Sequence, residues 1–347
     1  MVETHTQEIN AVSCGRSDLL SRARNSLSNF IRSLDSDYFA EGADVVRARA
    51  KTVELSRCIP FIALHAACLA AFWVRPSVFT LFVAISLYWL RMFAITGFHH
   101  RYFSHRSFST SRFMQFIFAV WGATSGQRGP LWWAAHHRTH HRESDKENDV
   151  HSPVQRGFLW SHIGWITSSA NIPTDYSAIP DLTKYPELVL VNRFDWVPPF
   201  LLALTLLIVG DMLRLSCPQL HTSGPQLLVW GFFVSTVVLF HGTCCINSVG
   251  HIFGSRRFAT DDESKNNLAL ALITLGEGWH NNHHRFPGAA RQGIFWWEID
   301  VTYYVLRVME TVGLVTDLRK HPEEAKQPPH KITPPSEIES DKQEIAV

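Results

Sequence analysis

The residues best able to do chemistry in this sequence are its histidines. There are 19 of them, and most fall into four clusters that lie far apart along the chain: HHRYFSH at 99–105, HHRTHH at 136–141, NSVGH at 247–251 and HNNHH at 280–284. A neutral imidazole nitrogen is a common metal ligand, so clustered histidines usually indicate a metal site. The first inference is therefore a site for metal ions, built from distant parts of the chain.

The spacing within the clusters is that of helix faces. The pattern H-x-x-H-H occurs at 137–141 and again at 280–284, and residues at i, i+3 and i+4 share one side of a helix. His100 and His105 are five apart, about 140° around an ideal helix, so both reach one site only if the helix ends between them. Ten side chains are too many for one ion with four to six ligands, and two ions are expected. The candidate ligands are His100, His105, His137, His140, His141, Asn247, His251, His280, His283 and His284.

Other histidines are expected to have different roles. His136 and His140 also stand at i, i+4, but the match between the two H-x-x-H-H patterns favours His137 as the ligand. His65 and His241 lie inside apolar runs, where a hydrogen-bonded contact between helices is expected rather than metal ligation. Solvent exposure, or a place just outside the metal ligands, is expected for His151, His162, His221, His321 and His330.

Acidic and aromatic residues near the clusters are candidates for supporting roles. Histidines that bind metal usually donate their second N–H to a carboxylate or a carbonyl oxygen. We expect Asp149 and Glu277 to act in this way, the alternative being plain surface charge. Trp132, Trp133 and Trp279 are candidate walls of a substrate tunnel, although aromatic residues in membrane proteins are more often interfacial anchors.

Four apolar runs are long enough to cross a bilayer as helices, which takes about 20 residues. They cover about 58–74, 77–96, 197–213 and 226–246. A fifth run at 112–126 is shorter and richer in glycine, as expected for an interfacial or re-entrant helix. The sequence thus predicts an all-α integral membrane protein with two helical hairpins and a cytosolic helical cap that carries the histidines.

The distribution of Lys and Arg predicts the orientation. These residues concentrate before the first run, between the second and third, and after the fourth, so both termini and the long central loop are expected in the cytoplasm. All four histidine clusters then lie on one side of the membrane. The expected division of the chain is a cytosolic N-terminal region (1–57), a four-span domain (58–315) and a polar, disordered tail (316–347).

Composition narrows the function further. With 32 Lys+Arg against 31 Asp+Glu, no nucleic-acid partner is indicated. Six cysteines form no C-x-x-C pair, which argues against a thiolate zinc site. Nitrogen-rich sites for two ions beside apolar helices suggest redox chemistry on an apolar molecule. A membrane electron carrier with bis-histidine haems is an alternative, but it would place histidine pairs in mid-membrane.

The motifs HRYFSH, HHRTHH and HNNHH resemble the three histidine boxes of the membrane fatty acyl desaturases. GEGWHNNHHRFP and NSVGH are most similar to acyl-CoA delta-9 (stearoyl-CoA) desaturases of bacterial type, and the resemblance runs from about 58 to 315. It implies a non-haem di-iron enzyme that uses O2 and two electrons to insert a cis double bond into a long saturated acyl chain, such as stearoyl- or palmitoyl-CoA. It also implies that the nine candidate histidines bind iron directly and that Asn247 contacts one ion through water.

The resemblance leaves several alternatives open. Related enzymes act on phospholipid-bound chains, and a di-iron fatty acyl or lipid hydroxylase would share the first hydrogen abstraction. The sequence has no H-P-G-G signature of a fused cytochrome b5, so the expected electron donor is a separate ferredoxin or cytochrome b5. A bacterial inner membrane is expected rather than the endoplasmic reticulum.

Overall fold

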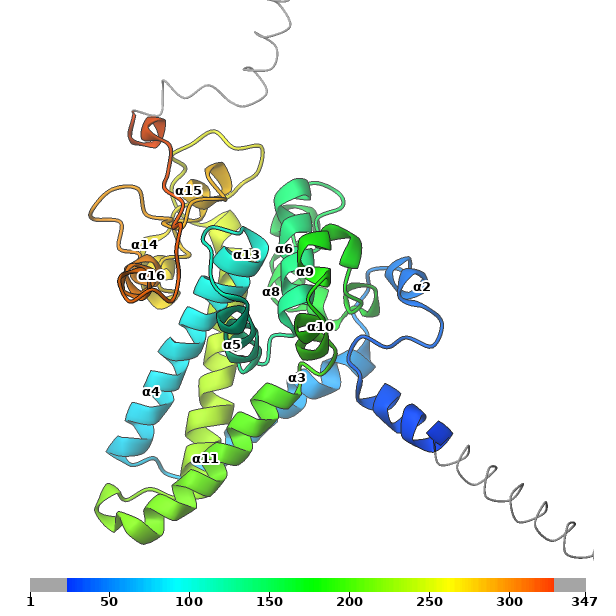
Figure 1. Ribbon diagram of the computed structural model, residues 1–347, viewed down its shortest axis with the longest axis vertical. Helices are drawn as coiled ribbons and strands as arrows, with labels where there is room; N and C mark the ends of the chain where they lie inside the picture. Colours follow the sequence, from blue (N-terminus) through cyan, green and yellow to red (C-terminus); the bar gives the residue numbers. More distant parts are fainter. Residues whose placement is uncertain (1–23, 328–347) are drawn as a thin grey trace, which may run out of the picture.

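The computed structural model describes residues 24–327 of the chain, and these are mainly helical. Only three isolated β-bridges occur among them, which confirms the predicted all-α class. Within residues 24–327, four helices are long and apolar enough to cross a membrane. In Figure 1 they occupy the lower half of the molecule, and the shorter helices gather above them in what we call the cap. The four candidate spans are Leu55–Phe72, Val78–Ser104, Val197–Ser216 and Pro218–Ile252.

Three of the four spans are built from consecutive helical pieces, and the third is a single helix. Ser77 begins the second span, because its hydroxyl accepts a hydrogen bond from the Thr80 amide and so caps the helix. Inside the membrane region, the buried Arg91 donates to the hydroxyls of Ser235 and Thr236 at 2.7 Å, which ties the second span to the fourth. The pieces are α3 (Leu55–Ala67) with η1 (Cys68–Phe72), α4 (Val78–Phe93) with η2 (Ala94–Ser104), α11 (Val197–Ser216), and η6 (Pro218–Leu220), α12 (Gly224–Gln226), η7 (Leu227–Val234) and α13 (Ser235–Ile252).

The second and fourth spans run further than their apolar runs predict. Their predicted ends were near 96 and 246, whereas the helices continue to Ser104 and Ile252. All residues of η2 are buried, and so is His251. Hydropathy identifies segments that are stable in lipid. It does not predict these polar helix ends, because they are surrounded by the cap and not by lipid. The two helices therefore carry histidines directly from the membrane region into the cap.

The helix ends at Ser104, between His100 and His105 as expected, but its last stretch is π-helical and not α-helical. The helix continues through His100 to Ser104 with π-helical winding, and the His105 amide donates to the His100 carbonyl at 3.2 Å. This i→i+5 bonding places residues five apart about one turn apart. The rings of His100 and His105 consequently lie with centroids 4.9 Å apart, a juxtaposition that an α-helix would not allow.

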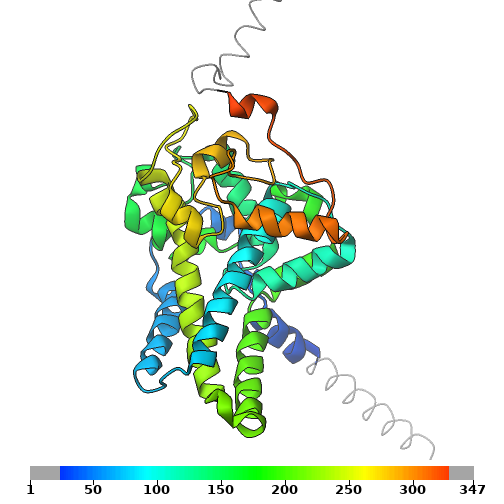
Figure 2. The same ribbon diagram turned by 90° about the vertical axis from the view of Figure 1, so that its left-hand side faces the viewer.

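The cap surrounds the upper ends of the second and fourth spans. The segment expected to be interfacial or re-entrant forms α5 (Arg112–Ala123), which packs against η2 and α10 (Pro186–Arg193). In Figure 2, α16 lies across the direction of the spans. Residues 24–34 are also helical. The other helices outside the spans are α2 (Ala43–Arg47), α5 (Arg112–Ala123), α6 (Pro130–Glu143), α7 (Pro153–Arg156), α8 (Phe158–His162), η3 (Gly164–Thr167), η4 (Ser169–Asn171), η5 (Tyr176–Ala178), α9 (Pro180–Thr183), α10 (Pro186–Arg193), α14 (Leu268–Ile273), α15 (His280–Arg285), α16 (Val301–Thr311) and η8 (Glu323–Lys326).

The chain on either side of the expected four-span domain is partly attached to the cap. Thr316 exchanges backbone hydrogen bonds with Ser109, and the Arg319 amide donates to the Ser107 carbonyl at 2.9 Å. Leu318 is buried. The first residues of the predicted tail thus pack on the body, and the rest of that tail, from 328 to 347, lies outside the described residues, as does 1–23 of the N-terminal region.

Candidate metal centre

The two H-x-x-H-H patterns lie on helices, α6 and α15. Each helix divides its three imidazoles between two groups of ring nitrogens. We call them the first group and the second group, and within each the candidate ligand atoms lie within 4.8 Å of one another. The first group is His100, His105, His137, His141 and His283, and the second group is His140, His251, His280 and His284.

In the first group several Nε2 atoms point at a common position. His283 Nε2 lies 3.0 Å from the Nε2 atoms of both His100 and His141, and His105 Nε2 lies 2.8 Å from His137 Nε2. One imidazole Nε2 has either a proton or a lone pair, so it can form a hydrogen bond with only one such neighbour. Convergence of this kind fits a cation at the centre of the group.

The second group has the same character. His251 Nε2 lies 3.1 Å from His280 Nε2. His284 Nε2 is buried and has no hydrogen-bond partner in the part of the chain that the structure describes. Buried polar atoms normally have a partner, and a metal ion would supply one here. The nine residues therefore fit a pair of metal ions bound mainly by nitrogen.

Burial and crowding keep five of these imidazoles neutral. Burial comes first, followed by repulsion from neighbouring imidazoles, and together they lower the pKa of five of them well below the usual histidine value. A neutral imidazole offers its lone pair to a metal. The five are His105, His137, His141, His280 and His283.

Both carboxylates expected to orient histidines do contact them. His140 Nδ1 lies 3.0 Å from Asp149 Oδ2, and His100 Nδ1 lies 2.5 Å from Glu277 Oε2. A neutral imidazole that donates Nδ1–H in this way directs the lone pair of Nε2 toward the group centre. Both carboxylates are buried, so the alternative of plain surface charge is wrong for them.

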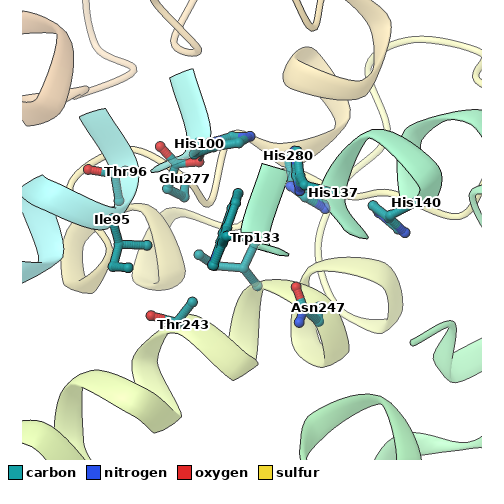
Figure 3. A pocket seen from close by; sticks show the side chains of 11 residues that line it. Ile95, Thr96, His100, Trp133, His137, His140, Thr243, Asn247, Glu277 and His280 are labelled. Carbon is teal, nitrogen blue, oxygen red and sulfur yellow. Dashed lines mark ion pairs between the residues drawn. The ribbon is translucent and has the colours of Figure 1, made fainter. Parts of the chain in front are cut away.

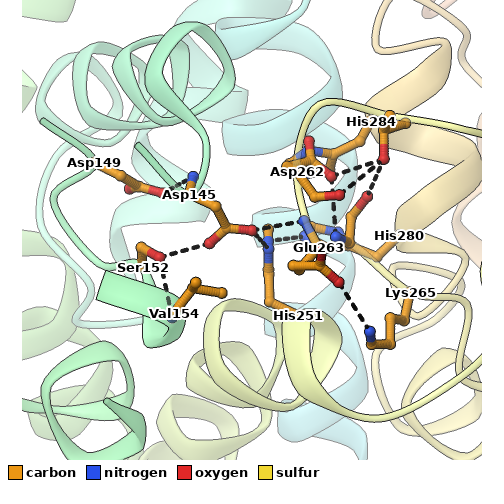
Figure 4. A network of polar contacts seen from close by, with 12 residues as sticks. Asp145, Asp149, Ser152, Val154, His251, Asp262, Glu263, Lys265, His280 and His284 are labelled. Atoms are coloured by element: carbon orange, nitrogen blue, oxygen red, sulfur yellow. Dashed lines mark hydrogen bonds and ion pairs between the residues drawn. The ribbon is translucent and has the colours of Figure 1, made fainter. Parts of the chain in front are cut away.

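Two further carboxylates with the same contact were missed. Asp145 Oδ2 lies 2.8 Å from His251 Nδ1, and Asp262 Oδ2 lies 2.6 Å from His284 Nδ1. Figure 4 shows Asp145 between Ser152 and His251, and Asp262 beside His284. Asp145 follows the second histidine cluster closely in sequence, which was a usable signal. Asp262 lies more than 20 residues before His284, and only the fold brings the two together.

A close backbone approach positions Glu277. Gly276 has φ 124°, and a Cβ atom there would lie only 2.5 Å from Asp300 Oδ1. Glycine tolerates both conditions, because it has no Cβ and readily adopts positive φ. Arg101 then bridges the two acids, with Nη2 3.0 Å from Glu277 and 2.9 Å from Asp300. The glycine of GEGWH thus places the carboxylate behind His100.

A small cavity adjoins both groups. Figure 3 shows its labelled walls, with Trp133 between His100 on one side and Asn247 on the other. Asn247, one helical turn before His251, lines the cavity as a ligand acting through water would require. Trp133 is on the wall, but Trp132 and Trp279 are not among the lining residues; their indole N–H groups donate to Asn171 and Ile299 carbonyls. The lining residues are Ile95, Thr96, His100, Trp133, His137, His140, Thr243, Ile246, Asn247, Glu277 and His280.

Histidines outside the two groups occupy other positions. His136 Nδ1 lies 3.0 Å from the Trp132 carbonyl, burial lowers its pKa to about 4, and His137 rather than His136 joins the first group. His65 Nε2 lies 2.9 Å from His241 Nε2, and His241 Nδ1 lies 3.0 Å from His162 Nε2. We call His65, His241 and His162 the histidine chain. Its contacts link helices, as expected for His65 and His241, and His162 is buried rather than solvated.

Fold and site together define a class: an all-α protein with four potential membrane spans and a buried histidine-rich site able to hold two metal ions. A family model described as fatty acid desaturase matches residues 76–309, which is most of the expected four-span domain. The chain belongs to the fatty acid desaturase family, and it is an oxidoreductase that acts on fatty acyl chains in a membrane.

Curated relatives narrow the class without fixing the substrate. An acyl-CoA 5-desaturase of Anemone leveillei is 38% identical over 261 residues, 74% of this chain and 76% of the relative. An sn-1 stearoyl-lipid 9-desaturase of Anabaena variabilis is 35% identical over 267 residues, which cover 75% of this chain and 91% of the relative. A delta-9 acyl-lipid desaturase of Arabidopsis thaliana is 33% identical over 272 residues, which cover 78% of this chain and 84% of the relative. The relatives differ in acyl carrier and in bond position at similar identity.

Proposed function

We propose that the protein is an O2-dependent desaturase that introduces a cis double bond, at the delta-9 position, into a long saturated acyl-CoA such as stearoyl- or palmitoyl-CoA. The observation that carries this proposal is the position of the cavity. Its wall combines the apolar side chains of Ile95, Trp133 and Ile246 with three histidines of the two groups. An acyl chain whose reacting carbons entered this cavity would lie beside the metal positions.

The two groups would hold two iron ions through their nine histidines, with Asn247 contacting one ion through water. Bound iron would supply, with O2 and two external electrons, the oxidising power needed to remove hydrogen from an unactivated methylene. The protein does the remainder. The carboxylates behind the imidazoles fix the direction of each lone pair, and burial excludes water from the reacting carbons.

The overall change balances when O2 is the electron acceptor. One –CH2–CH2– unit, O2, two electrons and two protons give one –CH=CH– unit and two molecules of water. The electrons come from a separate ferredoxin or cytochrome b5. Both termini and the metal centre face the cytoplasm in this proposal, and the membrane is a bacterial inner membrane.

The carrier of the acyl chain is the main alternative. Acyl-CoA is supported by the Anemone leveillei relative, and a phospholipid-bound chain is the second candidate because the Anabaena variabilis relative is named for a lipid substrate. A di-iron hydroxylase is a third candidate, and it differs in forming an alcohol instead of an alkene. Family membership argues against the haem-based electron carrier.

Expression in a host that lacks its own desaturase tests the proposal. Gas chromatography should show a new monounsaturated fatty acid with wild-type protein and none with His283→Ala, at equal amounts in the membrane. Purified protein given stearoyl-CoA, or a stearoyl phospholipid, with a reducing system separates the two carriers. A hydroxylated product, or no product with either carrier, would refute the desaturase assignment.

A further inference from the structure

The first and second groups differ in how many of their histidines contact a carboxylate. In the second group three of the four do: His140 contacts Asp149 at 3.0 Å, His251 contacts Asp145 at 2.8 Å and His284 contacts Asp262 at 2.6 Å. In the first group the contact recorded is that of His100 with Glu277, at 2.5 Å. The second position is therefore surrounded by more negative charge.

Compensation by cations increases the difference. Glu277 in the first group is paired with the buried Arg101, 3.0 Å away. In the part of the chain that the structure describes, the ion pairs of Asp145, Asp149 and Asp262 are with histidines alone. Their other hydrogen bonds come from hydroxyl groups and backbone amides, such as Ser152 Oγ and the Glu263 amide on Asp145.

A charged acceptor behind an imidazole makes its far nitrogen a stronger donor to a metal. The carboxylates also attract the cation directly, and the attraction is screened little in a buried site. Both effects grow with the charge of the ion. They act together at the second group, whereas at the first group they depend on one acid, Glu277, which shares the positive charge of Arg101 with Asp300.

We propose that the two metal positions are inequivalent: the second group binds a divalent ion first and more tightly, and of two bound irons it retains the ferric state when one electron is added. This rests on the proposed function only in taking the ions to be iron. The added electron comes from a chemical reductant, and it converts one ferric ion, at the first group, to ferrous.

Titration of metal-free protein with Co²⁺ tests the order of binding. Calorimetry should resolve a tight and a weak phase, each of one ion. His283→Ala and His284→Ala form a matched pair, because adjacent residues of α15 belong to different groups. His284→Ala should weaken the tight phase, and His283→Ala should weaken the weak phase. Two phases of equal affinity, or the reverse assignment, would overturn the proposal.

Charge-removing variants test the cause while keeping every imidazole. Asp145→Asn and Asp262→Asn should each weaken the tight phase by about 10- to 100-fold and leave the weak phase unchanged. Glu277→Gln should act on the weak phase only. Asp211→Asn, in an exposed pair with Arg214, is the control and should change neither. If the two aspartate variants bind like wild type, the carboxylates are not the cause and the proposal fails.

Selective isotope loading tests the oxidation states. One equivalent of the Mössbauer-active iron isotope is added first, followed by one equivalent of ordinary iron, and the oxidised protein then receives one electron per chain from dithionite. The Mössbauer signal, which reports the isotope added first, should remain that of ferric iron. When the isotope is added second, its signal should become that of ferrous iron. A signal that becomes ferrous in the first order would refute the assignment. These measurements need no turnover, so failure of the desaturase proposal would appear separately, as wild-type protein that makes no alkene.

Discussion

The two groups and the histidine chain all place ring nitrogens about 3 Å apart, but only the groups are arranged around a point. In the first group, His283 Nε2 lies 3.0 Å from two other Nε2 atoms. In the histidine chain, His241 uses Nε2 toward His65 and Nδ1 toward His162. Convergence of equivalent nitrogens, rather than short distance or local abundance, is what distinguishes a metal site.

The ends of the histidine chain show why it needs no ion. His65 Nδ1 lies 2.8 Å from the Phe61 carbonyl, and His162 Nδ1 lies 2.9 Å from Ser248 Oγ. The Ser248 hydroxyl also lies 3.0 Å from the Cys244 carbonyl. When it donates to His162, and His65 donates to Phe61, one choice of neutral tautomers satisfies every nitrogen in between. The histidine chain is a set of hydrogen bonds between α3, α13 and α8. The following predictions test whether it differs from the two groups in binding no metal.

Acidification of metal-free protein should have the largest effect. Five histidines of the groups have pKa values well below the ordinary value, chiefly through burial. Below about pH 6.5 the unfolded chain binds more protons than the folded one, so stability is retained above this pH and lost as the pH falls. Each such histidine contributes up to about 1.4 kcal/mol per pH unit. Thermal unfolding in detergent measures this, and a midpoint independent of pH between neutral and mildly acidic buffer would contradict it.

Removal of the metal ions should have the next largest effect. Each ion at a free concentration of about 100 times its dissociation constant stabilises the folded protein by about 2.7 kcal/mol. A chelator should therefore lower the unfolding midpoint of the metal-loaded protein at neutral pH. The shift should be the same in wild type and in His241→Phe, since the histidine chain holds no ion. A smaller shift of the unfolding midpoint in His241→Phe would mean that the histidine chain does bind metal.

His241→Phe should destabilise the protein by about 1–3 kcal/mol, because it leaves ring nitrogens of His65 and His162 without a partner. The iron content per chain should stay at the wild-type value. Unfolding midpoint and elemental analysis of the same preparation measure the two quantities. Loss of iron from His241→Phe with an unchanged unfolding midpoint would contradict this prediction. It would show that the histidine chain, like the two groups, takes part in binding metal.

Ser248→Ala should have the smallest effect, about 1 kcal/mol, since it removes one hydrogen bond at the end of the chain. His162 can keep its contact with His241 by retaining its tautomer. The unfolding midpoint should fall less than in His241→Phe. An effect as large as that of His241→Phe would show that Ser248 is needed for more than the terminal hydrogen bond.

Local spacing was enough to identify much of the site. The H-x-x-H-H patterns predicted three imidazoles on one helix face, and α6 and α15 present them in this way. Apolar runs of about 20 residues identified the four spans, because lipid selects for length and hydropathy. Spacing did not reveal that each pattern splits between two groups, with His140 in one and His137 in the other. That division depends on where neighbouring helices lie.

Other features were decided only by tertiary structure. The π-helical winding that brings His100 and His105 together lies in η2, which is buried in the cap, whereas the prediction used the geometry of an ideal α-helix. The contact of Asp262 with His284 joins distant segments. The sequence by itself determined the residue types, the helix faces and the membrane segments, since these follow from local periodicity and composition. Which nitrogens converge and which carboxylate stands behind each imidazole were decided by packing, because only the folded chain fixes distances between segments far apart in sequence.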